Sequence, residues 1–361
     1  MKVLIIGPFF PPVSGVSTAN ETLLEGLSEY LQVDSINMGY PEHSEDLGKF
    51  SIKKAIRAMR SYWYIYKVAL SDVVYMTPGQ TFYGILKYSP FILFSKLFGK
   101  KAIVHVHGDH VWREFDELKG IKKKAYSTTL SLFDEGIVLS ESLRKNLRPF
   151  LPEQNISVIN NFVEEDILGK LVPKTIVSKD LSRLNILFLS NLMEQKGTTD
   201  LLRSLLILKR KGIEFKAVFA GEIDARASKV VNSLLDELKA EVSYKGVVRG
   251  EAKLNLLAEA NVFVLPTYYA MEGQPIALLE AMAAGNTILT TQHAGIPDIF
   301  VQGRNGFYVR KQDPDDIAEK LILLSKTLPD RIPMMKNNHE EAKTFYTVEK
   351  FVRSVETLIK K

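Results

Sequence analysis

The chain has 361 residues, a formal net charge of +5 and no cysteine. This length suits two domains of moderate size, and the lack of cysteine excludes disulfides, thiolate metal sites and a cysteine nucleophile, which is compatible with a reducing cytosol. A signal peptide and a membrane span are not expected, because only Lys2 precedes the first apolar run and the apolar region 82–98 is interrupted by Lys87, Pro90 and Lys96.

Short apolar runs alternate with longer helical patterns along the chain, which is typical of parallel α/β domains. The first series of predicted strands covers residues 3–6, 33–36, 73–75, 102–106, 136–139 and 157–159. Polar sequence then predicts a linker near residues 165–183. The second series covers residues 185–189, 216–220, 241–244, 262–265, 287–289 and 306–309. We therefore expect one Rossmann-like domain over residues 1–170, another over 171–345 and a final helix over 346–361.

A glycine-containing loop follows the first predicted strand. Residues 7–16 read GPFFPPVSGV, which lacks the G-x-G-x-x-G pattern of dinucleotide-binding enzymes and argues against an NAD-dependent enzyme. Gly15 has no side chain, so backbone amides could approach a phosphate or a sugar there. A plain rigid turn between strand and helix is the alternative.

Three histidines lie at the end of the fourth predicted strand, namely His105, His107 and His110. The carboxyl ends of strands in such sheets open onto the ligand crevice. A zinc site is geometrically conceivable, but no carboxylate–histidine helix supports it, and we expect no metal.

Lys196 lies between a predicted strand and a predicted helix. Residues 187–197 read LFLSNLMEQKG, and the helix is expected to begin near Thr198. The N–H groups and dipole of a helix N-terminus favour anions, and a lysine adds its charge. The segment is thus a candidate clamp for a diphosphate, the alternative being an exposed lysine at the end of a loop.

Two carboxylates flank the start of an apolar helix. The segment EGQPIALLE runs from Glu272 to Glu280 and is followed by AMAAG, which ends at Gly285. Pro275 suits the first helical position and Gly285 can end the helix. Glu272 therefore lies in a loop and Glu280 inside the helix, so each can meet a different end of one ligand.

A second acidic motif, DPDD at residues 313–316, has the spacing of a metal-binding aspartate pair. We interpret Asp313 instead as a helix N-cap, with Pro314 at the first helical position.

These motifs together resemble the retaining GT-B glycosyltransferases of family four, the group 1 glycosyl transferases. The resemblance rests on the E-x7-E pattern with its EAMAAG tail, on Lys196-Gly197, on the Pro-Pro loop before Gly15, and on His107-Gly108. It covers essentially the whole chain and is densest over residues 185–320. It implies a GT-B fold, with two facing Rossmann-like domains and a terminal helix that crosses back onto the first domain.

The resemblance also implies residue roles. His107, Glu272 and Lys196 would be catalytic, with Glu272 on the donor sugar and Glu280 on the nucleotide ribose. Ser190-Asn191 stands where the family has Gly-Arg, so Asn191 would donate a hydrogen bond or Arg249, after the strand-like Val247-Val248, would replace the missing charge. The expected donor-binding residues are Gly15, Asn191, Lys196, Arg249, Glu272, Gly273, Gln274, Pro275, Ile276 and Glu280.

The implied reaction is transfer of a hexosyl group from a UDP- or GDP-sugar to a hydroxyl of a glycan or lipid-linked acceptor, without cofactor or metal. Its setting would be cell-surface polysaccharide or glycolipid synthesis. A nucleotide-sugar or sugar-phosphate binding protein without transferase activity is the alternative, and the substitution at Asn191 favours it.

Positive charge is concentrated between Gly48 and Lys101, where ten Lys or Arg residues face one acid, Asp72, a local excess of +9. Aromatic residues are interleaved with this charge, which suits an anionic membrane surface or a phosphate-bearing acceptor. A solvated face is the alternative. We expect a cytoplasmic protein, peripheral on the cytoplasmic face of the inner membrane, and no nucleic-acid partner.

Overall fold

The structure is a computed structural model that describes residues 1–11, 14–39, 56, 59–171, 176 and 178–361. The chain forms two compact units, each with its own sheet. The first unit comprises Met1–Asn161, Met271–Gln274 and Val348–Lys361, and the second comprises Phe162–Ala270 and Pro275–Thr347. The chain therefore passes from one unit to the other near residues 161, 270, 274 and 347.

The first unit contains a six-stranded parallel sheet with the order β2-β1-β3-β4-β5-β6. Its central strands β1, β3 and β4 are mostly apolar and buried, because helices cover both faces of the sheet, whereas the edge strand β2 is mostly polar. The strands are β1 (Lys2–Gly7), β2 (Gln32–Asn37), β3 (Val73–Met76), β4 (Lys101–Val106), β5 (Glu135–Val138) and β6 (Ile156–Val158). The helices are α1 (Gly15–Ser28), η1 (Tyr62–Tyr64), α3 (Tyr66–Ala69), α4 (Phe82–Leu86), α5 (Ser89–Leu97), α6 (Val111–Glu117), α7 (Gly120–Ser131), η2 (Glu141–Asn146), η3 (Glu153–Asn155) and α16 (Val348–Lys360).

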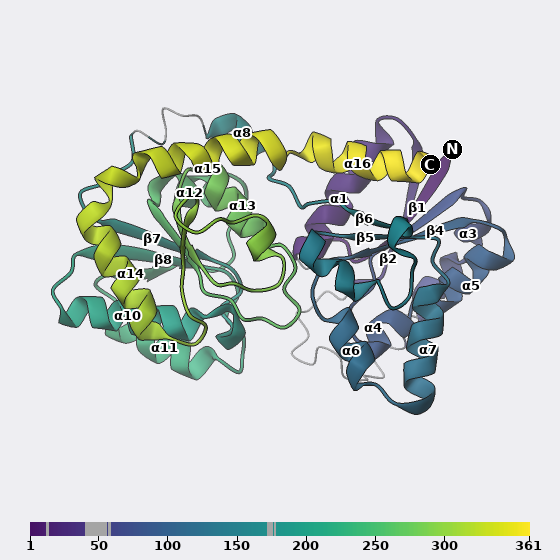
Figure 1. The fold of residues 1–361 in the computed structure, drawn as a ribbon, viewed down its shortest axis with the longest axis horizontal. Coiled ribbons are helices and arrows are strands. Elements are labelled where there is room, and N and C mark those ends of the chain that lie inside the picture. The colour runs from purple at the N-terminus through teal and green to yellow at the C-terminus, as the bar shows by residue number, and fades with distance from the viewer. Residues whose placement is uncertain (12–13, 40–55, 57–58, 172–175, 177) are drawn as a thin grey trace. The chain divides into compact units, whose positions relative to one another are not determined.

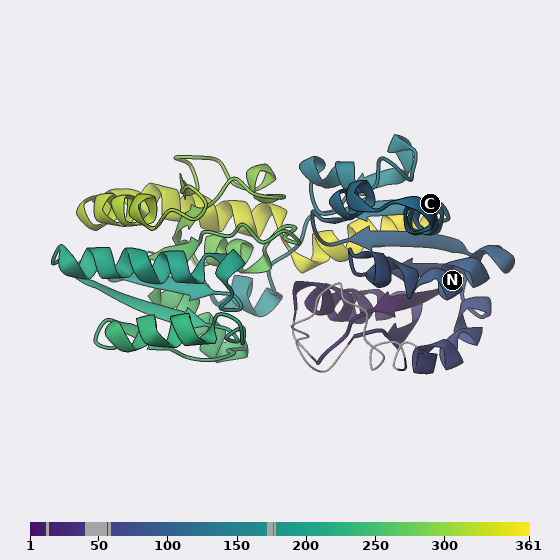
Figure 2. The same ribbon diagram turned by 90° about the horizontal axis from the view of Figure 1, so that it is seen from below.

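The last helix of the chain, α16, belongs to the first unit and packs against α1 (Figures 1 and 2). Its buried face consists of Phe351, Val352, Val355, Leu358 and Ile359. Lys101 Nζ donates to the Leu358 carbonyl over 2.7 Å and ties the helix to β4.

The second unit contains another six-stranded parallel sheet, in the order β12-β11-β10-β7-β8-β9. Its strands are β7 (Leu184–Leu189), β8 (Phe215–Ala220), β9 (Val242–Tyr244), β10 (Val262–Leu265), β11 (Thr287–Thr290) and β12 (Gly306–Tyr308). Its helices are α8 (Glu165–Lys170), η4 (Glu194–Lys196), α10 (Thr198–Arg210), α11 (Ser228–Glu237), α12 (Gly250–Glu259), α13 (Ile276–Ala283), η5 (Ile296–Asp298), α14 (Pro314–Thr327), η6 (Pro329–Arg331) and α15 (Ile332–Phe345). Figure 1 shows α10, α11 and α14 on one face of this sheet and α12, α13 and α15 on the other.

The predicted strands all occur, with ends that differ by a residue or two, and the α/β class with two parallel sheets is confirmed. Two local expectations are wrong. Val247-Val248 is not a strand, because the chain leaves the sheet after β9. The expected linker near residues 165–183 contains α8, which joins the second unit because Val163, Ile167 and Leu171 pack into its core.

Local capping follows the sequence closely. Asp313 caps α14, its side chain accepting from the Asp316 N–H over 3.0 Å, and Pro314 is the first helical residue. Pro275 lies one position earlier than expected, as the N-cap of α13, and Gly285 ends that helix at φ 65°. Within the described residues, no helix has the length and apolar character that a membrane crossing requires.

Candidate functional site

The carboxyl ends of β7 and β10 form the switch point of the second sheet, because the chain continues from β7 to β8 on one side and later returns to β10 on the other. Ligands in open α/β sheets bind at such points. Lys196 follows β7 and Tyr269 follows β10, and the Lys196 ammonium lies 5.0 Å from the centroid of the Tyr269 ring. The backbone N–H of Tyr268 donates to the Gln195 carbonyl over 2.8 Å, so the two loops are tied together.

Gly197 allows these loops to approach. Its φ is 77°, in the left-handed region, and a Cβ built on it would lie 2.5 Å from the Pro266 carbonyl oxygen. A side chain at this position is therefore excluded both by conformation and by space. Helix α10 begins at Thr198, as predicted, so Lys196 lies directly before a helix N-terminus. The combination suits an anionic ligand.

Glu280 lies inside α13, 3% exposed, and Lys253 of α12 is its partner. Lys253 Nζ lies 2.8 Å from a Glu280 carboxylate oxygen and 3.1 Å from one of Glu164. Burial raises the pKa of Glu280, and Lys253 limits the rise. Burial would lower the pKa of Lys253, but Glu280 and Glu164 outweigh it and the pKa is raised. The three side chains form a charged cluster in which Lys253 remains protonated at neutral pH.

The sequence analysis did not identify Lys253. The available signal was its position in the first turns of the helix that follows Arg249.

Glu272 lies beside the end of β4, because the loop Met271–Gln274 packs within the first unit. A Cβ on Gly273 would lie 2.3 Å from the His107 carbonyl oxygen. Gln80 Nε2 donates to the Met271 carbonyl over 3.2 Å. The structure thus brings Glu272, which is buried, close to the segment that carries His107.

Gln274 fixes this loop with both ends of its amide. Its Oε1 accepts from the Asn161 N–H over 2.6 Å and its Nε2 donates to the Leu139 carbonyl over 3.2 Å. Its backbone carbonyl accepts from Asn161 Nδ2 over 2.7 Å. These contacts hold the loop before Pro275 and Ile276 begin α13.

His107 is a neutral imidazole at the carboxyl end of β4. Its ring lies 4.0 Å from that of the fully buried His105, which bonds to the Tyr75 hydroxyl through Nδ1. Burial lowers the pKa of His107 to about 3 and that of His105 well below its usual range. In the described part of the chain, His107 Nε2 is out of water and has no hydrogen-bond partner. It is available to a ligand as a neutral donor or acceptor.

The three histidines do not converge. His105 Nδ1 is bonded to Tyr75, and His110 Nε2 lies 3.3 Å from the Glu114 carboxylate. Over the described residues, no three His, Cys, Asp or Glu side chains are grouped as metal ligands.

The remaining expected residues occupy loop and helix ends. Gly15 is the first residue of α1, behind a capping box in which Ser14 and Ser17 bond to each other's backbone N–H. Asn191 is half-buried in the loop after β7. Arg249 is exposed at the N-cap of α12. Gly15 thus follows β1 and Asn191 follows β7, which are strands at the switch points of the two sheets, whereas Arg249 follows the edge strand β9.

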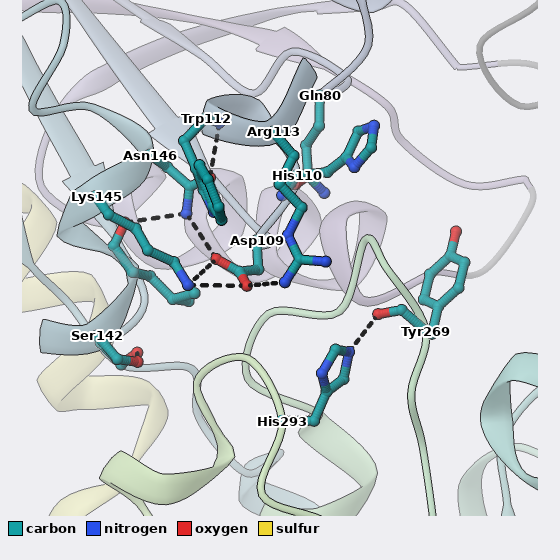
Figure 3. Close-up of polar contacts among 12 residues, drawn as sticks. Gln80, Asp109, His110, Trp112, Arg113, Ser142, Lys145, Asn146, Tyr269 and His293 are labelled. Carbon is teal, nitrogen blue, oxygen red and sulfur yellow. Dashed lines mark hydrogen bonds and ion pairs between the residues drawn. The ribbon is translucent and has the colours of Figure 1, made fainter. Parts of the chain in front are cut away.

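His293 joins the loop after β11 to the loop after β10 and was not identified from the sequence. Its Nε2 lies 2.7 Å from the Tyr269 carbonyl (Figure 3). Its Nδ1 lies 3.0 Å from Lys311 Nζ. The lysine donates, so Nδ1 accepts and Nε2–H donates to the carbonyl. This pair of bonds fixes the position of Tyr269 and, through it, the surroundings of Lys196.

Comparison with known proteins connects these features to one family. Residues 175–342 match the family model "Glycosyl transferases group 1". The amylovoran biosynthesis glycosyltransferase AmsK of Erwinia amylovora is 30% identical over 42% of this chain and 38% of its own length. The N,N'-diacetylbacillosaminyl-diphospho-undecaprenol alpha-1,3-N-acetylgalactosaminyltransferase of Campylobacter jejuni is 26% identical over 60% of this chain and 52% of its own length. These matches thus span about half or less of each relative.

The fold is shared with Anabaena Alr3699/HepE, whose crystal structure was determined in complex with UDP. The two chains are 15% identical and cover each other fully, with a TM-score of 0.74. This likeness confirms the expected GT-B fold.

Proposed function

We propose that the chain is a retaining glycosyltransferase of the glycosyl transferases group 1 family, whose model matches residues 175–342. It transfers a hexosyl group from a UDP- or GDP-sugar to a hydroxyl of a glycan or lipid-linked acceptor in cell-surface polysaccharide or glycolipid synthesis. The amylovoran enzyme supports the polysaccharide setting, and the Campylobacter enzyme, named for a diphospho-undecaprenol substrate, supports a lipid-linked acceptor. HepE, crystallised with UDP, supports a uridine nucleotide.

The observation that carries the proposal is the position of Lys196 at the switch point of the second sheet, directly before α10. A nucleotide diphosphate placed there meets a lysine charge and a helix N-terminus. Negative charge grows on the diphosphate as the sugar leaves, so these groups stabilise the transition state more than the ground state. Asn191 adds a hydrogen-bond donor on the same loop, and Arg249 supplies a further cation from the N-cap of α12. Gly15, the first residue of α1, gives backbone amides access to the donor.

Two carboxylates bind different parts of the donor. Glu280 accepts from the ribose hydroxyls and is held in its charged form by Lys253. Glu272, beside the His107 segment, positions the transferred sugar together with His107. The bond from the anomeric carbon to the phosphate oxygen breaks, the acceptor oxygen forms a new bond on the same face, and the leaving phosphate oxygen takes the acceptor proton. No metal is assigned a role in this step.

Nucleotide binding and turnover give separate tests. A panel of UDP- and GDP-sugars is scored first by protection from thermal unfolding, then by nucleotide release with glycan or lipid-linked acceptors, and the anomer of the product is assigned by NMR. We expect one nucleotide series to protect, release to require an acceptor, and the donor's anomeric configuration to be kept. Protection without release for any acceptor supports instead the binding protein that Asn191 favours, and an inverted product contradicts retention.

We further propose that the protein works at the cytoplasmic face of an anionic membrane. Part of the positive charge of residues 48–101 is compensated by aspartates from outside this region. Lys67 lies 2.7 Å from Asp34, and Lys96 lies 2.5 Å from Asp134. Large apolar side chains are nevertheless exposed on the packed pair α3 and α5 and next to it, including Trp63 (83% exposed) and Leu97 (74% exposed). Apolar side chains beside lysines suit the interface of a bilayer.

A flotation assay tests this proposal. We expect binding to vesicles that contain phosphatidylglycerol, release at high salt, and weaker binding after Trp63→Ala with Leu97→Ala. The fourfold change of Lys53, Lys54, Arg57 and Arg60 to Glu should abolish binding; the first three of these lie outside the described residues. Tyr30→Ala, which removes an exposed aromatic ring after α1, is the control. An unbound protein at low salt would favour a soluble acceptor.

A further inference from the structure

A second group of charged residues in the first unit is not used by the proposed transfer step. It is centred on Asp109, two residues after His107, at the carboxyl ends of the neighbouring strands β4 and β5. Lys145 Nζ lies 2.9 Å from Asp109 Oδ1 and 3.1 Å from Oδ2, and Arg113 Nη2 lies 3.4 Å from Oδ2 (Figure 3). Asn146 Nδ2 lies 3.4 Å from Oδ1.

The carboxylate of this group is buried, whereas its two cations are partly exposed. The Asp109 side chain is 2% exposed, whereas those of Arg113 and Lys145 are 39% and 41% exposed. The buried carboxylate therefore holds the two cations in place from the protein side, and both cations remain accessible to solvent. One carboxylate against two cations leaves an excess of one positive charge, and Asp109 uses only some of the eight N–H donors that a lysine and an arginine provide.

Trp112 lies close to both cations. The Lys145 ammonium is 5.3 Å and the Arg113 guanidinium carbon 5.4 Å from the tryptophan ring. Trp112 Nε1 and Arg113 Nε are out of water and have no hydrogen-bond partner among the described residues. Buried donors without an acceptor are uncommon in native proteins, and an acceptor oxygen from a ligand would satisfy them.

We propose that Arg113, Lys145 and Trp112 form a subsite for an anionic group of the acceptor, either a phosphate or a carboxylate. This inference rests on the proposed transferase function, because it assigns the second substrate a place next to His107. A guanidinium and an ammonium together match the oxygens of a phosphate or carboxylate, and the indole offers an N–H and a flat apolar face for an adjoining sugar or prenyl chain. One cation is enough to neutralise the Asp109 carboxylate, so the second positive charge is left for a ligand.

Tryptophan fluorescence can report on this subsite, because the chain has two tryptophans and the other, Trp63, is 83% exposed. In full-length Trp63→Phe protein the signal comes from Trp112 alone. Three probes are titrated: geranyl diphosphate for a lipid diphosphate, methyl phosphate for a phosphorylated sugar and glucuronate for a carboxylate. UDP is present throughout to occupy the proposed nucleotide site, and calorimetry repeats each titration without relying on fluorescence.

The same titrations are made on Trp63→Phe proteins that also carry Arg113→Gln, Lys145→Gln or, as control, Lys124→Gln. We expect saturable binding of at least one probe, weakened about tenfold or more by each of the first two changes and unaffected by the control. Arg113→Gln leaves Lys145 on Asp109, so this variant should fold even where Lys145→Gln does not. The probe that binds most tightly identifies the source of the anion.

Absence of saturable binding, or equal affinity in Arg113→Gln and in the control, would overturn the subsite. UDP protection from thermal unfolding is measured separately in each variant. If UDP fails to protect while the probes still bind, the proposed donor function fails and the anion subsite stands.

Discussion

Lys253 links the buried carboxylate of Glu280 to that of Glu164, with its ammonium 2.8 Å from the first and 3.1 Å from the second. An unpaired buried carboxylate would be costly, so Lys253 is what allows Glu280 to keep its charge inside α13. Because Glu164 also contacts Lys253, loss of either carboxylate leaves the lysine with a partner. The two carboxylates can therefore be removed one at a time.

The change Glu280→Gln should reduce turnover with the preferred nucleotide sugar by tenfold or more, while the protein remains folded. Loss of a charged acceptor for the ribose hydroxyls costs about 1.5–3 kcal/mol, and each 1.4 kcal/mol is about a factor of ten. The matched control is Glu164→Gln, which removes the other partner of Lys253 and should retain most activity. Equal activity of the two variants at saturating donor would argue against Glu280 as a ribose contact.

The change Lys196→Met should lower affinity for the nucleoside diphosphate and the rate of transfer together, because the lysine charge acts on the diphosphate in both the ground state and the transition state. Calorimetry with UDP or GDP and initial rates measure the two effects. Lys229→Met, an exposed lysine on α11, serves as the control. An unchanged dissociation constant for nucleotide in Lys196→Met would contradict the hypothesis that Lys196 binds the diphosphate at the switch point of the second sheet.

The change Gly197→Ala should destabilise the second unit and reduce activity, although no charge is altered. A Cβ would lie 2.5 Å from Pro266 O at φ 77°, so the loops after β7 and β10 must separate or the backbone must move. Left-handed conformation alone costs about 1 kcal/mol for a residue with a side chain. Urea unfolding and nucleotide binding are the measurements, and Gly212→Ala, also at positive φ but with open space around it, separates backbone strain from the clash. If Gly197→Ala lowers the free energy of unfolding no more than Gly212→Ala does, close approach of the loops after β7 and β10 is not required for stability.

Activity should survive chelation. The imidazoles of His105 and His110 are engaged by Tyr75 and Glu114, and the proposed stabilisation of the diphosphate comes from Lys196 and α10. Transfer rates with and without EDTA test this expectation. Loss of activity on chelation, restored by manganese, would require a metal at the diphosphate.

The positions of strands and helix ends could be predicted from the sequence because they depend on local patterns. The apolar runs of β1 and β7, the Asp313 cap and the Gly285 terminus each depend on a few adjacent residues. Lys253 and His293 could not be assigned in this way, since their partners lie 27 and 24 residues away in the chain. The same limit applies to the basic region, where Asp34 and Asp134 compensate two lysines from outside it.

The unit to which the loop of Glu272 belongs could not be predicted from the sequence either. The E-x7-E spacing predicts a loop followed by a helix, and that is what forms. The spacing does not reveal that Met271–Gln274 packs with the first unit while α13 belongs to the second. That division depends on Gly273 lying against the His107 carbonyl and on Gln274 bonding to Asn161, contacts between segments more than a hundred residues apart.

Acid should destabilise the first unit through the histidines at the end of β4, His105 and His107. Burial lowers the pKa of His107 to about 3, whereas a histidine in the unfolded chain titrates near 6.5. Between these values the unfolded state binds more protons than the folded state, so stability is lost as the pH falls below about 6.5. The contribution of His107 is about 1.4 kcal/mol for each pH unit in that window.

Comparison with His107→Gln isolates this contribution from that of the carboxylates, which also protonate in acid. The difference in unfolding free energy between native protein and variant should shrink by about 1 kcal/mol between about pH 7 and about pH 5.5. Urea unfolding at both pH values, with equal denaturant dependence in the two proteins, provides the measurement. A constant difference would mean that the His107 ring is protonated in the folded protein as readily as in water, and that it faces the acceptor as a cation rather than as a neutral imidazole.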